Sequence, residues 1–277
     1  MAAERSFLFV PGDRPERFAK ALAAEADRVI VDLEDAVTPD AKDGAREILA
    51  RWLKSAEARD VLVRVNPPTT RWYDEDMRAL AHLPAVAGLM LPKAEDADAL
   101  AATRARMRPE AALIGLVETV RGFACLRAVA QVPGMARLAF GSVDFCLETG
   151  IQGQGAELDF ARAQLTLESC LAGLAAPIEG VTVDIKSLAT LQTDIERARR
   201  YGFGGKLCIH PTQVRPINAG FSPSEESIAW AHRVLAAARS AAKSGTGAVT
   251  VDGKLVDRPI ILQAEKVLAM VAVQLTR

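Results

Sequence analysis

The sequence has few aromatic residues, no long apolar run and no excess of either charge. Phe, Trp and Tyr make up 5% of the 277 residues, so Ala, Leu and Val supply most of the apolar bulk, as suits helices packed on a parallel sheet. No uninterrupted apolar run reaches the roughly 18 residues of a membrane span. Lys and Arg number 34 and Asp and Glu 35, a formal net charge of -1. We therefore expect no membrane partner and no nucleic-acid partner.

Cysteine is scarce, and its spacing excludes further classes of site. Cys125, Cys146, Cys170 and Cys208 form no C-x-x-C pair and no spacing typical of zinc ligands. The first residues show neither the basic segment nor the apolar segment of a signal peptide. The sequence therefore predicts four reduced thiols in a cytoplasmic protein.

Short apolar segments alternate with amphipathic segments over residues 1–220. Eight apolar segments read as strands buried on both faces: Phe7–Pro11, Arg28–Leu33, Val61–Asn66, Gly88–Pro92, Ala112–Glu118, Arg137–Gly141, Ile178–Asp184 and Lys206–His210. Helices fit between them, and the helix predicted after the sixth strand begins only at Ala156. Eight strands each followed by a helix predict an α/β fold, a (β/α)8 TIM-type barrel. A doubly wound open sheet has the same local signal, so the count of eight carries the prediction.

The pattern changes after residue 220. Residues 240–247 are predicted to be a flexible linker, and residues 249–256 a hairpin with Asp252 and Gly253 at its turn. A last helix carries apolar residues from Ile260 to Val271. We predict that residues 221–277 form a helical and hairpin extension of the barrel. It is too small for an independent core and is expected to pack on the barrel or on a neighbouring subunit.

Polar residues gather where the predicted strands end, which is the active-site end of such a barrel. They are Glu34, Asp35, Arg64, Asn66, Lys93, Glu118, Asp144, Asp184 and His210. Unpaired charges at a half-buried rim are costly, and a hard cation offsets that cost. Mg²⁺ favours one or two protein carboxylates together with water and substrate oxygens. Glu118 and Asp144, from neighbouring strands, are the best pair of predicted metal ligands.

Two basic residues at this end allow more than one role. Arg64 is either a rim partner of Glu34 or Asp35, or a fixed guanidinium that faces a carboxylate or a developing enolate. Lys93 is expected to pair with a carboxylate, because acidic surroundings raise a lysine pKa and disfavour a Schiff-base role. His210 is expected to be a hydrogen-bonded residue at a strand end.

Several segments resemble one known family, and together they run through nearly the whole chain in order. They are Phe9–Arg17, Asp32–Val37, Val63–Asn66, Leu91–Glu95, Leu116–Thr119, Phe140–Asp144, Cys208–Pro211 and Val256–Pro259. In these segments the chain resembles the citrate lyase β-subunit-like family, within the malyl-CoA lyase and hydroxy-keto-acid aldolase superfamily. The resemblance implies a TIM-type barrel with a C-terminal extension that crosses to a neighbour in a homotrimer or hexamer.

The resemblance also implies roles at the mouth of the barrel. Mg²⁺ would be bound by Glu118 and Asp144, and Arg64 would face a thioester carbonyl. Glu34 and Asp35 would hold metal-bound water and Arg64.

Three further residues enter through the resemblance. Asp257, in the extension, would complete the active site of a neighbouring subunit as the proton-transfer group. Arg14 and Lys20 would meet the phosphates of coenzyme A. The segment around Arg14 also joins a strand to a helix N-terminus, which is a natural anion site.

The implied activity is Mg²⁺-dependent cleavage of a carbon–carbon bond in a short 3-hydroxyacyl-CoA, with citramalyl-, malyl- and citryl-CoA as candidates. The products would be acetyl-CoA and a keto acid. One alternative is a β subunit of a citrate lyase complex, which acts on a citryl thioester carried by an acyl-carrier protein. Two others are an aldolase for free keto acids and a binding protein that kept the fold.

Overall fold

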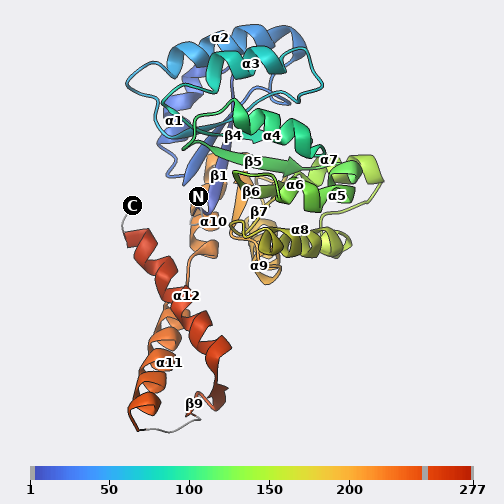
Figure 1. The fold of residues 1–277 in the computed structure, drawn as a ribbon. Coiled ribbons are helices and arrows are strands. Elements are labelled where there is room, and N and C mark those ends of the chain that lie inside the picture. The colour runs from blue at the N-terminus through green and yellow to red at the C-terminus, as the bar shows by residue number, and fades with distance from the viewer. Residues whose placement is uncertain (1–3, 245–248, 276–277) are drawn as a thin grey trace. The chain divides into compact units, whose positions relative to one another are not determined.

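The structure of the chain is a computed structural model that describes residues 4–244 and 249–275. These residues divide into two compact units, one that ends at Ala219 and one that begins at Gly220 (Figure 1).

The first unit is built on a closed barrel of eight parallel strands in chain order. The strands are β1 (Ser6–Pro11), β2 (Arg28–Asp32), β3 (Val61–Arg64), β4 (Val86–Leu91), β5 (Ala112–Val117), β6 (Met135–Phe140), β7 (Ile178–Glu179) and β8 (Gly205–Cys208). Each strand pairs with the next, and β8 pairs with β1 to close the ring. The predicted TIM-type barrel is confirmed.

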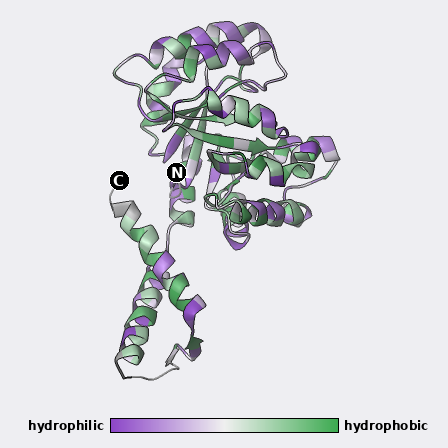
Figure 2. Cartoon of the chain, in the orientation of Figure 1, coloured by the Kyte–Doolittle hydropathy of each residue, from purple (hydrophilic) through white to green (hydrophobic). Residues whose placement is uncertain are grey.

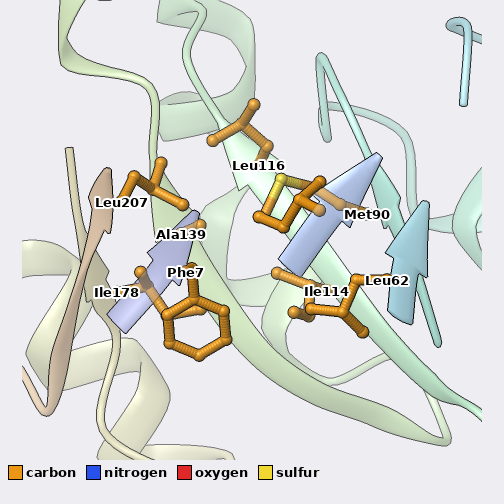
Figure 3. Close-up of a cluster of buried hydrophobic side chains, with 9 residues drawn as sticks. Phe7, Leu62, Met90, Ile114, Leu116, Ala139, Ile178 and Leu207 are labelled. Carbon is orange, nitrogen blue, oxygen red and sulfur yellow. The ribbon is translucent and has the colours of Figure 1, made fainter. Parts of the chain in front are cut away.

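The interior of the barrel is a packed core rather than a channel. Alternate residues of the strands point inward, as the period of two in a strand requires. Phe7, Leu62 and Ile114 meet there with Met90 and Ile178 (Figure 3). These side chains are fully buried and fill the space between the strands. A ligand must therefore bind at an end of the barrel.

Helices lie outside the strands and turn polar faces outward. They are α1 (Phe18–Leu22), α2 (Lys42–Trp52), α3 (Tyr73–Leu80), α4 (Ala97–Ala105), α5 (Val120–Ala124), α6 (Leu126–Ala130), α7 (Ser142–Thr149), α8 (Asp159–Leu171), α9 (Leu188–Arg200) and α10 (Val214–Phe221), with short 3-10 turns at residues 15–17, 39–41, 156–158 and 211–213. In Figure 2 α2 and α3 are largely hydrophilic, whereas β5 is largely hydrophobic. The strands thus supply the core, and the helices shield it.

Most strand ends lie within two residues of the prediction, and two elements differ more. Strand β7 was predicted to extend to Asp184 but ends at Glu179. Beyond it, side chains bind the carbonyls: Lys206 Nζ donates to Gly180 O at 2.6 Å and Gln213 Nε2 to Thr182 O at 2.8 Å. Helix α7 was not predicted, since the first helix expected after the sixth strand began only at Ala156.

The second unit consists of two helices and a hairpin. The elements are α11 (Glu225–Ser244), β9 (Val249–Val251), β10 (Lys254–Val256) and α12 (Arg258–Leu275). The hairpin prediction is confirmed, with Asp252 and Gly253 both at positive φ, 52° and 76°. The predicted linker is wrong for residues 240–244, which belong to α11, and residues 245–247 lie outside the described residues.

The core of this second unit is small. Ala231, Val234, Val256 and Ala264 are buried together, while Trp230 and its apolar neighbours around them are only partly covered. Within the described residues of both units, no helix is long and apolar enough to cross a membrane. The four cysteines are free thiols, as predicted.

Candidate active site

A cavity of about 340 Å³ opens at the carboxyl ends of the barrel strands. Its walls are mostly apolar, and its charged lining consists of Asp32, Asp35, Arg64, Glu118 and Asp144. Four of the predicted site residues, Asp35, Arg64, Glu118 and Asp144, thus share one cavity with Asp32. The cavity has the size and the mixture of apolar wall and few polar groups typical of small-molecule sites.

Arg64, at the end of β3, is fixed by carboxylates on three sides. Its Nε and Nη2 donate to the two oxygens of Asp32 at 2.7 and 2.6 Å, a bidentate pair. Its Nη1 lies 3.1 Å from Glu34 and 3.5 Å from Asp35. Burial lowers the pKa of this guanidinium, but the carboxylates of Asp32 and Glu34 more than reverse the effect. Arg64 is therefore a permanent cation of fixed orientation.

Lys93 connects two of the acids around the cavity. Its Nζ donates to Glu34 Oε1 at 2.9 Å and its backbone N–H to Glu118 Oε1 at 2.8 Å. The expected pairing with a carboxylate is confirmed. Lys93 has φ of 49°, in the left-handed region that a residue with a side chain rarely adopts. This backbone turns the N–H toward Glu118 while the side chain reaches Glu34.

Glu118 is the buried acid of the cavity, with 2% of its surface exposed. Burial raises its pKa to about 8, and the negative charges of Glu34 and Asp144 act in the same direction. A Cβ atom on Gly141 would lie 2.3 Å from Glu118 Cβ and 2.6 Å from Oε2. Glycine at position 141 is therefore needed for this carboxylate to occupy its place.

Asp144 comes from the first turn of α7, and no side chain caps that helix. The first amides of an α-helix have no acceptor within the helix and form a partial positive charge. Gly141, Ser142 and Val143 line the cavity beside Asp144. The helix start thus presents amide donors and a carboxylate to the same space.

The donor set fits a divalent cation. Five carboxylates lie in the cavity lining or next to it, Asp32, Glu34, Asp35, Glu118 and Asp144, and three cations accompany them, Arg64, Lys93 and Lys42. When all five carboxylates are ionised, two negative charges are in excess, which is the charge that one Mg²⁺ would neutralise.

The described residues contain no cluster of three or more His, Cys, Asp or Glu side chains with metal-site geometry. A pair of carboxylates is nevertheless what Mg²⁺ commonly takes from a protein, because water and substrate supply its other oxygens. Glu118 and Asp144 are such a pair.

Other predicted residues lie away from the cavity lining. Arg14 and Lys20 are exposed, and Arg14 Nε lies 3.7 Å from Asp13. Asp257 is exposed in the second unit, where its Oδ1 accepts from Ile260 N at 3.2 Å at the start of α12. The roles that the resemblance gave to these three residues stay predictions.

Two polar residues expected at strand ends cap local structure instead. Asp184 lies five residues beyond the last residue of β7 and accepts from the amides of Lys186 and Ser187. His210 caps the 3-10 turn after β8 and binds Thr212, as its expected hydrogen-bonded role implies.

A charged side chain near the cavity was not predicted from the sequence. Lys42, the first residue of α2, is buried beneath the loop that carries Glu34 and Asp35. Its only sequence signal is a lysine inside an otherwise apolar helix face, between Ala41 and Ala45. The same pattern is common for long side chains whose charged ends reach solvent. The sequence therefore cannot distinguish a buried ammonium group from an exposed one at this position.

Residues 5–211 match the family model of the HpcH/HpaI aldolase/citrate lyase family. The chain belongs to this family. A citrate lyase subunit beta-like protein of Mycobacterium tuberculosis is 38% identical over 274 residues, which cover 96% of this chain and 95% of that protein. A (3S)-malyl-CoA thioesterase of Cereibacter sphaeroides is 36% identical over 273 residues, with 96% and 93% covered.

A solved structure extends the likeness over both units. CitE from Mycobacterium tuberculosis, in complex with magnesium, acetoacetate and coenzyme A, has a TM-score of 0.83 and 35% sequence identity and covers 98% of this chain and 99% of that one. The resemblance to the citrate lyase β-like family is confirmed. The chain is an enzyme of the carbon–carbon lyase class, and the expected cofactor, Mg²⁺, is the metal in that complex.

Proposed function

We propose that this enzyme is a Mg²⁺-dependent lyase that cleaves a short 3-hydroxyacyl-CoA, malyl-, citramalyl- or citryl-CoA, into acetyl-CoA and a keto acid. The observation that carries the proposal is that Glu118, Asp144 and the fixed cation Arg64 line the same cavity. The CoA-bound CitE structure and the relative named malyl-CoA thioesterase support a CoA thioester as substrate.

Glu118 and Asp144 would hold the metal between them. Bound there, Mg²⁺ would supply Lewis acidity toward the carboxylate and hydroxyl oxygens of the substrate. The amide groups at the start of α7 add donors for the same carboxylate, because they lie beside Asp144 in the lining. Glu34 and Asp35 would bind water in the site and hold Arg64.

Arg64 would stabilise the charge that develops when the carbon–carbon bond breaks. When the 3-hydroxyl group gives its proton to water in the site, its oxygen becomes the carbonyl oxygen of the keto acid. The electron pair of the broken carbon–carbon bond then stays on the thioester fragment as an enolate. Asp32 occupies Nε and one hydrogen of Nη2, which leaves the second Nη2 hydrogen for the enolate oxygen. A donor fixed before the reaction stabilises such an oxyanion without reorganisation.

Asp257 would give the enolate carbon its proton, or remove a proton from acetyl-CoA in the reverse direction. It would act from a second copy of the chain, in a homotrimer or hexamer. Its exposure and its place at the start of α12 leave the carboxylate accessible to a partner. Exposed Arg14 and Lys20 would meet the phosphates of coenzyme A.

A second candidate function is suggested by the name of the Mycobacterium tuberculosis relative, citrate lyase subunit beta-like protein. The chain would then be the β subunit of a complex and would act on a citryl thioester bound to an acyl-carrier protein. Co-purification with such a carrier from the source cell would favour it.

The decisive experiment is an assay of the purified chain on malyl-CoA and on (S)-citramalyl-CoA, with detection of the keto acid and acetyl-CoA. Cleavage that EDTA abolishes and Mg²⁺ restores would support the free-standing lyase, and the preferred substrate would identify its acyl group. Cleavage of neither compound, together with activity on a carrier-bound citryl thioester, would favour the second candidate.

A further inference from the structure

We propose that Lys42 is a positioning residue of the active site: its ammonium group fixes the loop that carries Glu34 and Asp35 against the end of β3. Lys42 lies outside the residues that line the cavity, so it acts through the loop and not on the substrate. The anchoring role does not depend on the proposed function. Only the kinetic test of that role rests on it, because the test measures the rate of the proposed reaction.

The contacts of Lys42 use the whole ammonium group. Nζ donates to Leu33 O at 2.8 Å, to Glu34 O at 2.8 Å and to Asn66 Oδ1 at 2.6 Å. An ammonium group has three hydrogens, and here each has one acceptor. Two acceptors are consecutive carbonyls of the loop after β2, and the third follows β3. The side chain is 7% exposed.

The third acceptor is itself held in place. Asn66 donates from its backbone N–H and from Nδ2 to Asp76 Oδ2, at 3.0 and 2.7 Å. Asp76 in turn accepts from Arg46 Nε at 2.8 Å. With Nδ2 directed to Asp76, the Oδ1 of Asn66 must face Lys42. The network therefore ties the loop after β2 to α2 and α3.

The loop needs such an anchor because of what it carries. Glu34 meets Arg64 and Lys93 through its two oxygens, at 3.1 and 2.9 Å, and Asp32 receives the N–H groups of Glu34 and Ala36. A shift of the loop would move the partners of Arg64, and with them the donor proposed to meet the enolate. The misplacement of reacting groups by about 1 Å can lower a rate by about 10²-fold.

A lysine is costly at this position, which argues that its geometry matters. Burial lowers the pKa of Lys42, against the attraction of Glu34 and Asp32. The ring of Trp72 covers the ammonium at 5.2 Å and limits access of water. Methionine has similar length and would pack against Trp72 with no such cost, but it provides no donor.

The test compares Lys42→Met with Lys206→Met. Lys206 is also buried, 1% exposed, and donates to O of Gly180, the residue that follows β7, at 2.6 Å. Lys206→Met is therefore a control for the loss of a buried ammonium group. We expect Lys42→Met to lower kcat by about 10²-fold, with KM and the Kd for Mg²⁺ within about threefold of wild type. Lys206→Met is expected to lower the melting temperature but to keep kcat within about threefold.

Equal loss of kcat in both variants, or wild-type kcat in folded Lys42→Met, would overturn the proposal. If Lys42→Met does not fold, Lys42→Arg decides, because it keeps the charge but cannot direct three hydrogens to the same acceptors. A kcat at least about fivefold below wild type supports positioning by geometry, and an unchanged kcat refutes it.

Amide hydrogen exchange separates this proposal from the proposed function. Residues 33–37 should exchange faster in Lys42→Met than in wild type and in Lys206→Met, whether or not any thioester is cleaved. If residues 33–37 exchange faster in Lys42→Met but the wild-type protein cleaves neither thioester, the anchor proposal stands and the proposed substrate is refuted. Unchanged exchange would refute the anchor itself.

Discussion

The two ends of the barrel both bury ionisable side chains, but they neutralise them differently. At the amino end, Arg5 donates to both oxygens of Asp27, at 2.8 and 2.9 Å, and Arg28 pairs with Glu4 at 3.0 Å. Arg137, fully buried, donates to backbone carbonyls, Glu4 O at 2.8 Å among them. At the carboxyl end, acids outnumber the cations that accompany them.

Burial therefore has opposite effects on the pKa values of the ionisable groups at the two ends. Burial lowers the pKa of Arg137 to about 10, so it remains charged at neutral pH with carbonyls as partners. Burial raises the pKa of Glu118 to about 8, so at pH 7 it holds a proton unless a cation is bound. The amino end is built for stability, and the carboxyl end is built to receive a ligand.

The largest effect should come from Glu118→Gln. Without this carboxylate the pair that binds Mg²⁺ is lost, and we expect turnover to fall on the order of 10³-fold with loss of Mg²⁺ dependence. Glu4→Gln at the amino end should lower the melting temperature and leave kcat near wild type. Steady-state kinetics with and without EDTA would measure both. Turnover by Glu118→Gln that still depends on Mg²⁺ would contradict the assignment.

At the amino end, Arg137→Met should change stability and not function. The carbonyls of Glu4 and Ala176 would lose a buried donor, and we expect a loss of about 3 kcal/mol in the free energy of unfolding. Urea denaturation measures this loss, and calorimetry of the folded variant should give an unchanged Kd for Mg²⁺. A clear change in that Kd would show that the two ends are coupled.

Two glycine substitutions, one at each end of the barrel, test the same difference between the ends. A Cβ at Gly141 meets Glu118, whereas a Cβ at Gly205 lies 2.7 Å from Arg5 O and 2.9 Å from Glu4 O. Overpacking typically costs about 1–3 kcal/mol, so Gly141→Ala should weaken Mg²⁺ binding about tenfold. Gly205→Ala should lower the melting temperature alone. Equal Kd values in the two variants would argue against Glu118 as a metal ligand.

The smallest expected effect is a pH dependence of Mg²⁺ binding. Mg²⁺ must displace the proton of Glu118, so with a pKa of about 8 affinity should rise about fivefold from pH 7 to 8 and less than about twofold from pH 8 to 9. Calorimetry at these pH values would show it. A Mg²⁺ affinity of the wild-type protein that does not change with pH would exclude Glu118 as a metal ligand.

The same titration gives the sign of a stability effect. The folded carboxyl binds its proton more tightly than the unfolded one, whose pKa has the ordinary value of 4.5. Its contribution to the stability of the metal-free protein is therefore complete below pH 4.5 and is lost as the pH rises through about 8. Saturating Mg²⁺ should remove this loss, which thermal melts with and without metal would detect.

The sequence predicted the barrel and most of its mouth because both depend on local patterns. Buried parallel strands are continuous apolar segments, and a polar residue directly after such a segment lies at the active-site end. Arg64, Glu118 and Asp144 were found in this way. The extent of β7 was wrong because Lys206 and Gln213, distant in sequence, bind the carbonyls that a longer strand would have used.

The sequence by itself determined the fold class, the family and the carboxylates beside the cavity, since apolar periodicity and strand-end motifs are properties of short segments. Only the tertiary structure decided which charges pair. It placed Asp32 on Arg64 and Lys93 between Glu34 and Glu118. It also buried Lys42 beneath the loop after β2. Such pairings depend on distances and dielectric surroundings that exist only after the chain has closed its barrel.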